Sequence, residues 1–227
     1  MIRTVIFDMD GVLVDTEPLH HDAFFRHFTE LGVTVSPEEY GTFLGASTRN
    51  VYQQVKERFK LPQDLDELMD RKRELFAKAF NESKELDLIP GARQLVEDLH
   101  EHGVPLVVAS SASRGTIDRV FTRFALYPFF AHIVSGEDFT KSKPDPAIFL
   151  RAAELTSTPP TECLVVEDAA NGVAAAKAAG MYCIGYSSEH SQGQDLHHAD
   201  RVVSNLAELD AATILAFPGA TDSVGAV

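Results

Sequence analysis

Short apolar segments alternate with segments of helical spacing along most of this chain. The apolar segments are too short for buried helices and predict strands, at 4–7, 104–109, 132–134, 163–166, 182–185 and 201–203. The segments between them predict helices at 92–102, 116–124, 146–155 and 172–179. This alternation predicts a doubly wound α/β fold, in which helices cover both faces of a parallel sheet.

The segment 16–86 interrupts this alternation because it contains no convincing strand. Leu19, Phe24 and Leu31 recur at helical spacing, and Ser36 begins a capping box with proline at the first helical position. We therefore expect a helical cap domain at 16–86, above the carboxyl edge of an α/β core made of 1–15 and 87–217. The remaining segment, 218–227, predicts a disordered tail.

Composition and charge exclude several classes of protein. The chain has 227 residues and a formal net charge of -14, which argues against a nucleic-acid backbone as partner. Its two cysteines, Cys163 and Cys183, lie in predicted buried strands, so we expect reduced thiols without a disulfide. No segment has the pattern of a signal peptide or a membrane span, so a cytoplasmic protein is expected.

Two carboxylates follow the first predicted strand. Asp8 and Asp10 are separated by one residue, so their side chains point to the same side of the chain. A divalent metal, or a proton on one carboxylate, would offset their repulsion. Mg²⁺ prefers oxygen ligands, and a carboxylate can attack phosphorus as a nucleophile. Considered alone, the pair is explained equally well by a solvated acidic loop.

Polar side chains also follow three later strands, and such strand ends meet at one edge of a parallel sheet. Ser110 and Ser111 can bind a phosphate oxygen or cap a helix. Lys143 suits a phosphate or a nucleophilic carboxylate, or is an ordinary surface lysine. Glu167 and Asp168 end a buried strand, where acids are costly unless paired or metal-bound, or they cap the next helix. Their recurrence at successive strand ends favours a phosphate site.

With these motifs the chain resembles the haloacid dehalogenase superfamily. The residues that carry the resemblance are Asp8-x-Asp10-Gly11-Val12, Ser110, Lys143-Pro144 and Glu167-Asp168-x-x-x-Gly172-Val173, in the order of the four motifs of that superfamily. The helical insert is similar to that of a subgroup with a four-helix cap, which includes β-phosphoglucomutases and sugar-phosphate phosphatases. The resemblance covers nearly the whole chain.

The resemblance implies a role for each motif residue. Asp8 would carry the phosphoryl group, and Asp10 would act as acid and base. Mg²⁺ would be held by Asp8, the main-chain carbonyl of Asp10 and Asp168, with Glu167 in an outer position. Asp10 must then be protonated for part of the cycle, through a raised pKa or a proton that arrives with the substrate. The residues that would bind the oxygens of the transferred group are Ser110 and Lys143.

A further set of residues would bind the rest of the substrate. The cap residues that resemble the β-phosphoglucomutase pattern are His20, Arg49 and Lys72. On the core, Ser111 and Arg114 are candidates, and Arg114 could hold a second phosphate. The alternative for these cap and core cations is a solvated helix face.

Departures from the mutase pattern favour hydrolysis. Phe24 stands where those mutases carry a tryptophan, and the stretch 15–20 is more similar to general phosphatases. We expect a Mg²⁺-dependent phosphatase of a small phosphorylated metabolite such as a sugar phosphate, with a phosphosugar mutase as the alternative. Dehalogenases lack the second aspartate, and a non-catalytic binding module would lose Asp8 or Asp168. The acidic charge permits a monomer or a homodimer.

Overall fold

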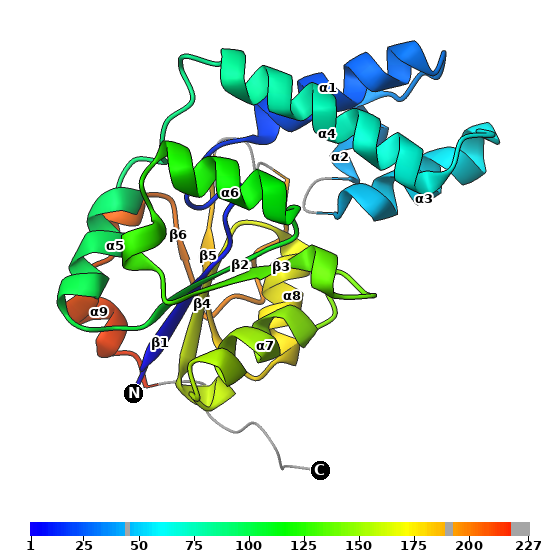
Figure 1. The fold of residues 1–227 in the computed structure, drawn as a ribbon. Helices are drawn as coiled ribbons and strands as arrows, with labels where there is room; N and C mark the ends of the chain where they lie inside the picture. The colour runs from blue at the N-terminus through cyan, green and yellow to red at the C-terminus, as the bar shows by residue number, and fades with distance from the viewer. Residues whose placement is uncertain (44–45, 189–192, 219–227) are drawn as a thin grey trace, which may run out of the picture.

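A parallel sheet forms the centre of the molecule (Figure 1). The computed structural model describes residues 1–43, 46–188 and 193–218. The strands in these ranges are β1 (Thr4–Phe7), β2 (Leu106–Ser110), β3 (His132–Ser135), β4 (Cys163–Glu167), β5 (Tyr182–Tyr186) and β6 (Arg201–Val203). Their order is β3-β2-β1-β4-β5-β6, and all neighbouring pairs are parallel. The predicted α/β fold class is therefore confirmed.

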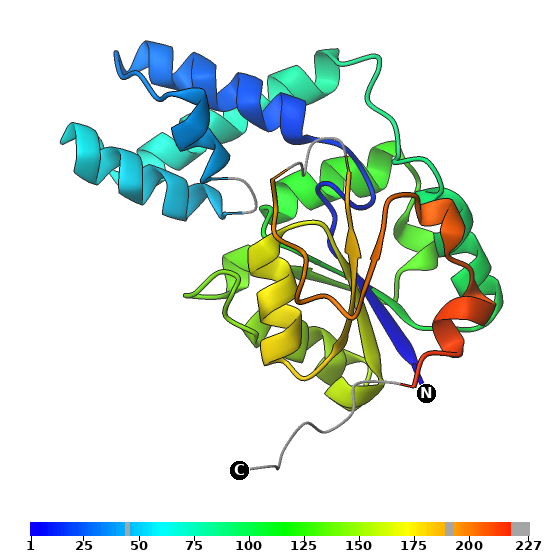
Figure 2. The ribbon, with the colours of Figure 1, turned by 180° about the vertical axis from the view of Figure 1, so that it is seen from behind.

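Helices cover both faces of the sheet because the strands are apolar on both faces. In β1, Val5 and Phe7 point to one face and Ile6 to the other, and all three are fully buried. The face of Val5 packs against α5 (Ala92–Glu101), α6 (Arg114–Arg123) and α9 (Ala211–Leu215), and the opposite face against α7 (Ala147–Leu155) and α8 (Ala170–Ala178). Figures 1 and 2 show the two helical layers from opposite sides.

A helical insertion lies above the carboxyl ends of the strands (Figure 1). Its helices are α1 (Glu17–Glu30), α2 (Pro37–Gly41), α3 (Thr48–Phe59) and α4 (Leu65–Glu82). Phe24, Phe28 and Tyr52 belong to an apolar cluster within the insertion, whereas Phe76 and Phe80 of α4 join the cluster beneath α5 and α6. The assignment of 16–86 as a separate domain stays a prediction.

The two connections between the insertion and the sheet are paired with each other. Val14 and Leu88 form an antiparallel bridge, and the main-chain nitrogen of Ile89 donates to the carbonyl of Leu13 at 3.0 Å. The guanidinium of Arg123 in α6 also binds the end of α4 and the connection that follows. The carbonyls that accept from it are those of Phe80, Ser83 and Leu86. These contacts determine where the insertion lies over the strand ends.

Element boundaries differ from the prediction mainly at helix starts. α6 begins at Arg114, two residues before the predicted start, because Ser113 caps it by accepting from the main-chain nitrogen of Thr116. α9 is too short to produce a periodic pattern and was not predicted. The predicted tail lies, from residue 219 on, outside the described residues. No helix of the described ranges combines the length and apolarity that a membrane span needs.

Candidate active site

The polar side chains at the strand ends come together in one cavity. Asp8 follows β1, while Ser110 and Glu167 are the last residues of β2 and β4, the two neighbours of β1 in the sheet. Asp168 directly follows Glu167 in the chain. Lys143 lies in the loop before α7, and its side chain lines the same cavity. This cavity opens to solvent, and the empty space in it and at its mouth measures about 950 Å³.

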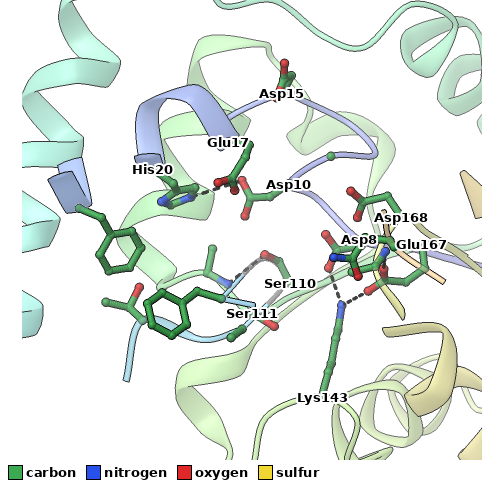
Figure 3. A pocket seen from close by; sticks show the side chains of 18 of the residues that line it. Asp8, Asp10, Asp15, Glu17, His20, Ser110, Ser111, Lys143, Glu167 and Asp168 are labelled. Atoms are coloured by element: carbon green, nitrogen blue, oxygen red, sulfur yellow. Dashed lines mark hydrogen bonds and ion pairs between the residues drawn. The ribbon is translucent and has the colours of Figure 1, made fainter. Parts of the chain in front are cut away.

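Lys143 joins the two acidic strand ends. Its Nζ lies 2.5 Å from Asp8 Oδ1, 2.7 Å from Glu167 Oε1 and 3.3 Å from the carbonyl of Ala109 (Figure 3). Burial opposes the charge of Lys143, but Asp8 and Glu167 outweigh it and raise the lysine pKa above its ordinary value. Lys143 is therefore a buried ammonium between two carboxylates, and the surface-lysine alternative is excluded.

Asp8 and Asp168 concentrate negative charge at the centre of the cavity. Burial raises the pKa of Asp8 to about 7, with Lys143 acting against it and Glu167 and Asp10 adding to it. Burial also raises the pKa of Asp168 well above its ordinary value, and the charges of Glu167 and Asp8 act in the same direction. A cation between Asp8 and Asp168 would relieve this repulsion.

These carboxylates fit a magnesium ion. In the described residues, no group of three or more His, Cys, Asp or Glu side chains has the arrangement of a metal site. Mg²⁺ does not require one, because it typically uses one or two carboxylates together with waters and substrate phosphate. Asp8 and Asp168 would supply the carboxylates. Both oxygens of Glu167 already have protein partners, Lys143 and the main-chain nitrogen of Ala169, in keeping with an outer position.

Two glycines provide the space that these carboxylates occupy. A Cβ atom at Gly11 would overlap the carboxylate of Asp168, and one at Gly172 would overlap that of Glu167. Gly11 also has a φ of 84°, a conformation that other residues rarely adopt. The glycines of the first and last motifs are thus required by the packing of acidic side chains.

Replacing Gly172 by alanine is expected to displace Glu167 and, through it, Lys143. We expect a loss of about 1–3 kcal/mol in the free energy of unfolding and a fall in turnover of about tenfold or more. Urea unfolding and phosphate release would measure the two effects. The control is Gly115→Ala in α6, where a Cβ would lie 3.4 Å from the flexible end of Arg119. Equal effects of the two substitutions would contradict the role given to Gly172.

Asp10 lies on the side of the cavity nearer to α1 (Figure 3). The Thr16 hydroxyl donates to Asp10 Oδ1, and His20 Nε2 lies 3.8 Å from the same oxygen. Burial acts to raise the pKa of Asp10, but His20 and Thr16 outweigh it and lower that pKa. These contacts therefore stabilise the ionised form of the Asp10 carboxyl.

Two of the predicted cap residues reach this cavity together. Lys72 Nζ lies 2.6 Å from His20 Nδ1 and sits over the ring of Phe24, 4.4 Å from its centroid. Burial lowers the pKa of Lys72 to about 7. When Lys72 donates to Nδ1, the His20 proton lies on Nε2 and faces Asp10. Ser111 also lines the cavity, beside Ser110.

The two predicted arginines lie elsewhere. Arg49 pairs with Asp66 at 2.8 Å and lines an adjoining cavity between the insertion and the core. Arg114 pairs with Asp138 at 2.6 Å, and its side chain is 63% exposed. Neither lines the cavity of Asp8. Substrate binding by these residues stays a prediction, and their present contacts are those of surface ion pairs.

Several lining residues were not predicted to have a role. They are Asp15, Glu17, Tyr40, Phe43 and Gln194. Glu17 could have been found, because it lies one helical turn before His20 and so shares its face of α1. Tyr40 and Gln194 carry no such signal. Gln194 comes from the segment after β5, and its Oε1 accepts from the main-chain nitrogen of Ala170 at 2.9 Å, at the start of α8.

The buried carboxyl of Glu17 predicts a pH-dependent stability. Burial raises its pKa from the ordinary 4.5 to about 7 in the folded protein. Between these two pH values the unfolded chain therefore binds fewer protons, and stability falls as the pH rises. Glu17→Gln imitates the protonated form. We therefore expect its free energy of unfolding to exceed that of the wild type by about 3 kcal/mol above pH 7 and to match it below pH 4.5.

Urea unfolding of the metal-free proteins between pH 4 and pH 8 would measure this difference. The charged or titratable groups that act on Glu17 are Tyr40, Asp10, Lys72 and Asp15. Glu57→Gln, on the exposed side of α3, is the control and should show no such trend. A constant difference between Glu17→Gln and the wild type across this range would contradict the prediction.

A parallel sheet with acidic strand ends beneath a helical insertion defines a class of α/β hydrolases. Residues 5–186 match the model of the haloacid dehalogenase-like hydrolase family. The chain belongs to this family, and the predicted resemblance is confirmed. Among its relatives, some are named as phosphatases and one as a mutase.

Similar proteins span nearly the whole chain. Protein CbbY of Rhodobacter capsulatus is 30% identical, over 96% of this chain and 98% of that protein. Beta-phosphoglucomutase of Bacillus subtilis is also 30% identical, over 92% of each. A crystal structure of CbbY from Rhodobacter sphaeroides in complex with xylulose-(1,5)bisphosphate superposes with a TM-score of 0.85 at 28% identity, covering 95% of this chain and 99% of that one. Two relatives from Arabidopsis thaliana are longer, and the chain spans 18% and 54% of their lengths.

Proposed function

We propose that this protein is a Mg²⁺-dependent phosphatase of a small phosphorylated metabolite, with a sugar phosphate as the expected substrate. The observation that carries the proposal is the position of Asp8. It is buried beside Lys143 at the centre of the cavity, with Asp10 on the side that faces the insertion. A nucleophile, a cation that orients it and an acid/base group are thus gathered in one site.

In the proposed reaction, an Asp8 carboxylate oxygen attacks phosphorus while the bond from phosphorus to the leaving oxygen breaks. Asp10 gives a proton to the leaving oxygen, and the phosphoryl group stays on Asp8. Asp10 then takes a proton from water as the water oxygen attacks phosphorus, which releases inorganic phosphate and restores Asp8. Lys143 opposes the rise in the Asp8 pKa and would orient the carboxylate before the attack, and Ser110 would bind an oxygen of the transferred group.

Asp8, Asp168 and the main-chain carbonyl of Asp10 would hold the metal ion. Bound there, Mg²⁺ would neutralise the carboxylates and the charge of the phosphoryl group. Because the pKa of Asp10 is low, a monoanionic phosphate ester is the form expected to bring the proton that Asp10 passes on. A cytoplasmic location and a monomeric or homodimeric state also stay predictions.

Removing the metal is expected to stop turnover. With p-nitrophenyl phosphate as substrate, EDTA should lower turnover by about 100-fold or more, and added MgCl₂ should restore it. Circular dichroism should stay unchanged in EDTA, because the apolar clusters of the sheet and of the insertion do not include the metal site. Full turnover in EDTA would contradict metal dependence, and no turnover with any metal would favour a non-catalytic binding protein.

The alternative is a phosphosugar mutase, which passes the phosphoryl group to a sugar hydroxyl instead of water. Its support is the similarity to Beta-phosphoglucomutase of Bacillus subtilis. Hydrolysis is supported by Arg49 and Arg114, which pair with Asp66 and Asp138 instead of entering the cavity of Asp8. Interconversion of β-glucose 1-phosphate and glucose 6-phosphate, dependent on a bisphosphate primer, would identify the mutase.

A further inference from the structure

The side of the cavity opposite Asp8 receives the leaving group of the substrate. The core side, with Asp8, Lys143 and Ser110, is occupied by the phosphoryl group in the proposed reaction. In that reaction Asp10 protonates the leaving oxygen, and Asp10 lies on the side of the cavity that faces the insertion. The remainder of the substrate therefore extends toward the insertion. The side chains that line this part of the cavity are Glu17, His20, Phe24, Tyr40, Phe43, Thr48 and Lys72.

Glu17 is a hydrogen-bond acceptor held in place in this wall, the part of the cavity that the insertion lines. It lies in the first turn of α1, and the hydroxyl of Tyr40 donates to its Oε1 at 2.8 Å. A carboxyl group keeps acceptor capacity whether it is ionised or protonated, and Tyr40 occupies only one acceptor site of Glu17. Lys72 acts on Glu17 electrostatically, and the nearby His20 faces Asp10 instead. Figure 3 shows Glu17 beside Asp10 and His20 at the cavity.

Tyr40 is itself held by aromatic packing, so the position of Glu17 is determined before substrate binds. The Tyr40 ring contacts the rings of Phe24, Phe25 and Phe43 edge-on, with centroids 6.0, 5.3 and 6.3 Å away. Only 7% of Tyr40 is exposed. A preorganised acceptor gains more from a ligand donor than a mobile one, because less side-chain freedom is lost on binding.

The chemistry of this wall selects a class of leaving group. A carboxylate accepts hydrogen bonds from hydroxyl groups, and it repels an anion placed against it. The neighbouring rings of Phe24 and Phe43 offer apolar surface. Acceptor and ring faces together suit the hydroxyl groups and the carbon skeleton of a sugar or polyol.

We propose that Glu17, positioned by Tyr40, binds a hydroxyl group of the leaving group and thereby makes the enzyme selective for sugar or polyol monophosphates over phosphate esters without hydroxyls. This inference rests on the proposed phosphatase activity. Glu17 is thus a specificity-determining residue, and Tyr40 is a residue that positions Glu17.

The test compares two kinds of substrate in the Mg²⁺-loaded enzyme. A panel of pentose, hexose and polyol monophosphates provides hydroxylated substrates, and p-nitrophenyl phosphate is the reference without hydroxyls. Assayed above pH 7, where the Glu17 carboxyl is ionised, Glu17→Ala should lower kcat/KM for the best hydroxylated substrate by about 10- to 100-fold, the value of a hydrogen bond to a charged group. The same variant should change kcat/KM for p-nitrophenyl phosphate less than about threefold, since no such bond is lost.

Further variants separate recognition from folding. Tyr40→Phe should reproduce a smaller part of the loss, chiefly in KM, and only for hydroxylated substrates. Glu17→Gln keeps the shape and one acceptor, so an intermediate loss is expected even if Glu17→Ala folds poorly. Glu57→Ala, on the exposed side of α3, is the control. With a deoxy analogue that lacks the contacted hydroxyl, the wild type and Glu17→Ala should become equal.

The outcomes distinguish this inference from the proposed function. Equal losses for both kinds of substrate, or a wild type that does not prefer the hydroxylated panel, would overturn the role of Glu17 and leave the phosphatase intact. Turnover that survives in Asp8→Asn would instead overturn the proposed function.

Discussion

Asp8→Asn is expected to lower phosphate release by about 10⁴-fold or more. The amide nitrogen and oxygen of asparagine are poor nucleophiles, so no aspartyl phosphate can form. Asp8 is buried next to Lys143, and no other carboxylate replaces it at the end of β1. Release of phosphate from p-nitrophenyl phosphate, followed with and without Mg²⁺, would measure the effect.

The same variant should still fold and bind. Asparagine has the shape of aspartate and can accept from Lys143, and it removes one of the charges that crowd Glu167 and Asp168. We therefore expect a Tm equal to or above that of the metal-free wild type. Mass spectrometry of the wild type, quenched during turnover, should show a phosphoryl group on Asp8 that the variant lacks. A variant that retains more than about one per cent of wild-type turnover would contradict the assignment of Asp8.

Lys143→Met is expected to damage both stability and catalysis. The ammonium is 3% exposed and lies between Asp8 and Glu167. Its removal leaves two buried carboxylates without their cation, which costs about 3–5 kcal/mol in the free energy of unfolding. Turnover should fall by about 10²- to 10³-fold, because the charge that orients Asp8 and faces the phosphoryl oxygens is lost. Urea unfolding and phosphate release would measure these effects.

A neighbouring lysine provides the control. Lys141 is 79% exposed and lies 3.9 Å from Asp145, so Lys141→Met should change neither quantity measurably. If Lys143→Met does not fold, Lys143→Arg keeps the charge and should recover stability but little turnover, because the larger guanidinium does not fit the same contacts. Equal behaviour of Lys141→Met and Lys143→Met would contradict the central position of Lys143.

The sheet and its acidic edge could be predicted from local patterns. Short apolar runs such as 163–166 have few alternatives once helical segments lie on both sides of them. Parallel strands end at one edge, so Asp8, Ser110 and Glu167 had to lie near one another when β1, β2 and β4 became neighbours. The meeting of these residues therefore followed from strand ends that the sequence marks with polar residues.

The partners of long side chains could not be predicted in this way. Substrate binding by Arg49 and Arg114 stays a prediction, and their ion pairs with Asp66 and Asp138 were not predicted. Lys72 was expected at the substrate and does line the cavity, where it contacts His20. These outcomes depend on which groups approach within a few ångströms after the helices pack, and helical spacing contains no information about that distance.

By itself, the sequence determined the α/β fold, the helical insertion and the residues at the strand ends, because hydrophobic periodicity and short motifs are local properties of a chain. Tertiary structure decided which charges meet. It placed Lys143 between Asp8 and Glu167, lowered the pKa of Asp10 through His20 and Thr16, and brought Tyr40 of α2 against Glu17 of α1. These properties depend on burial and on distances between segments far apart in the chain, since electrostatic energies change steeply with both.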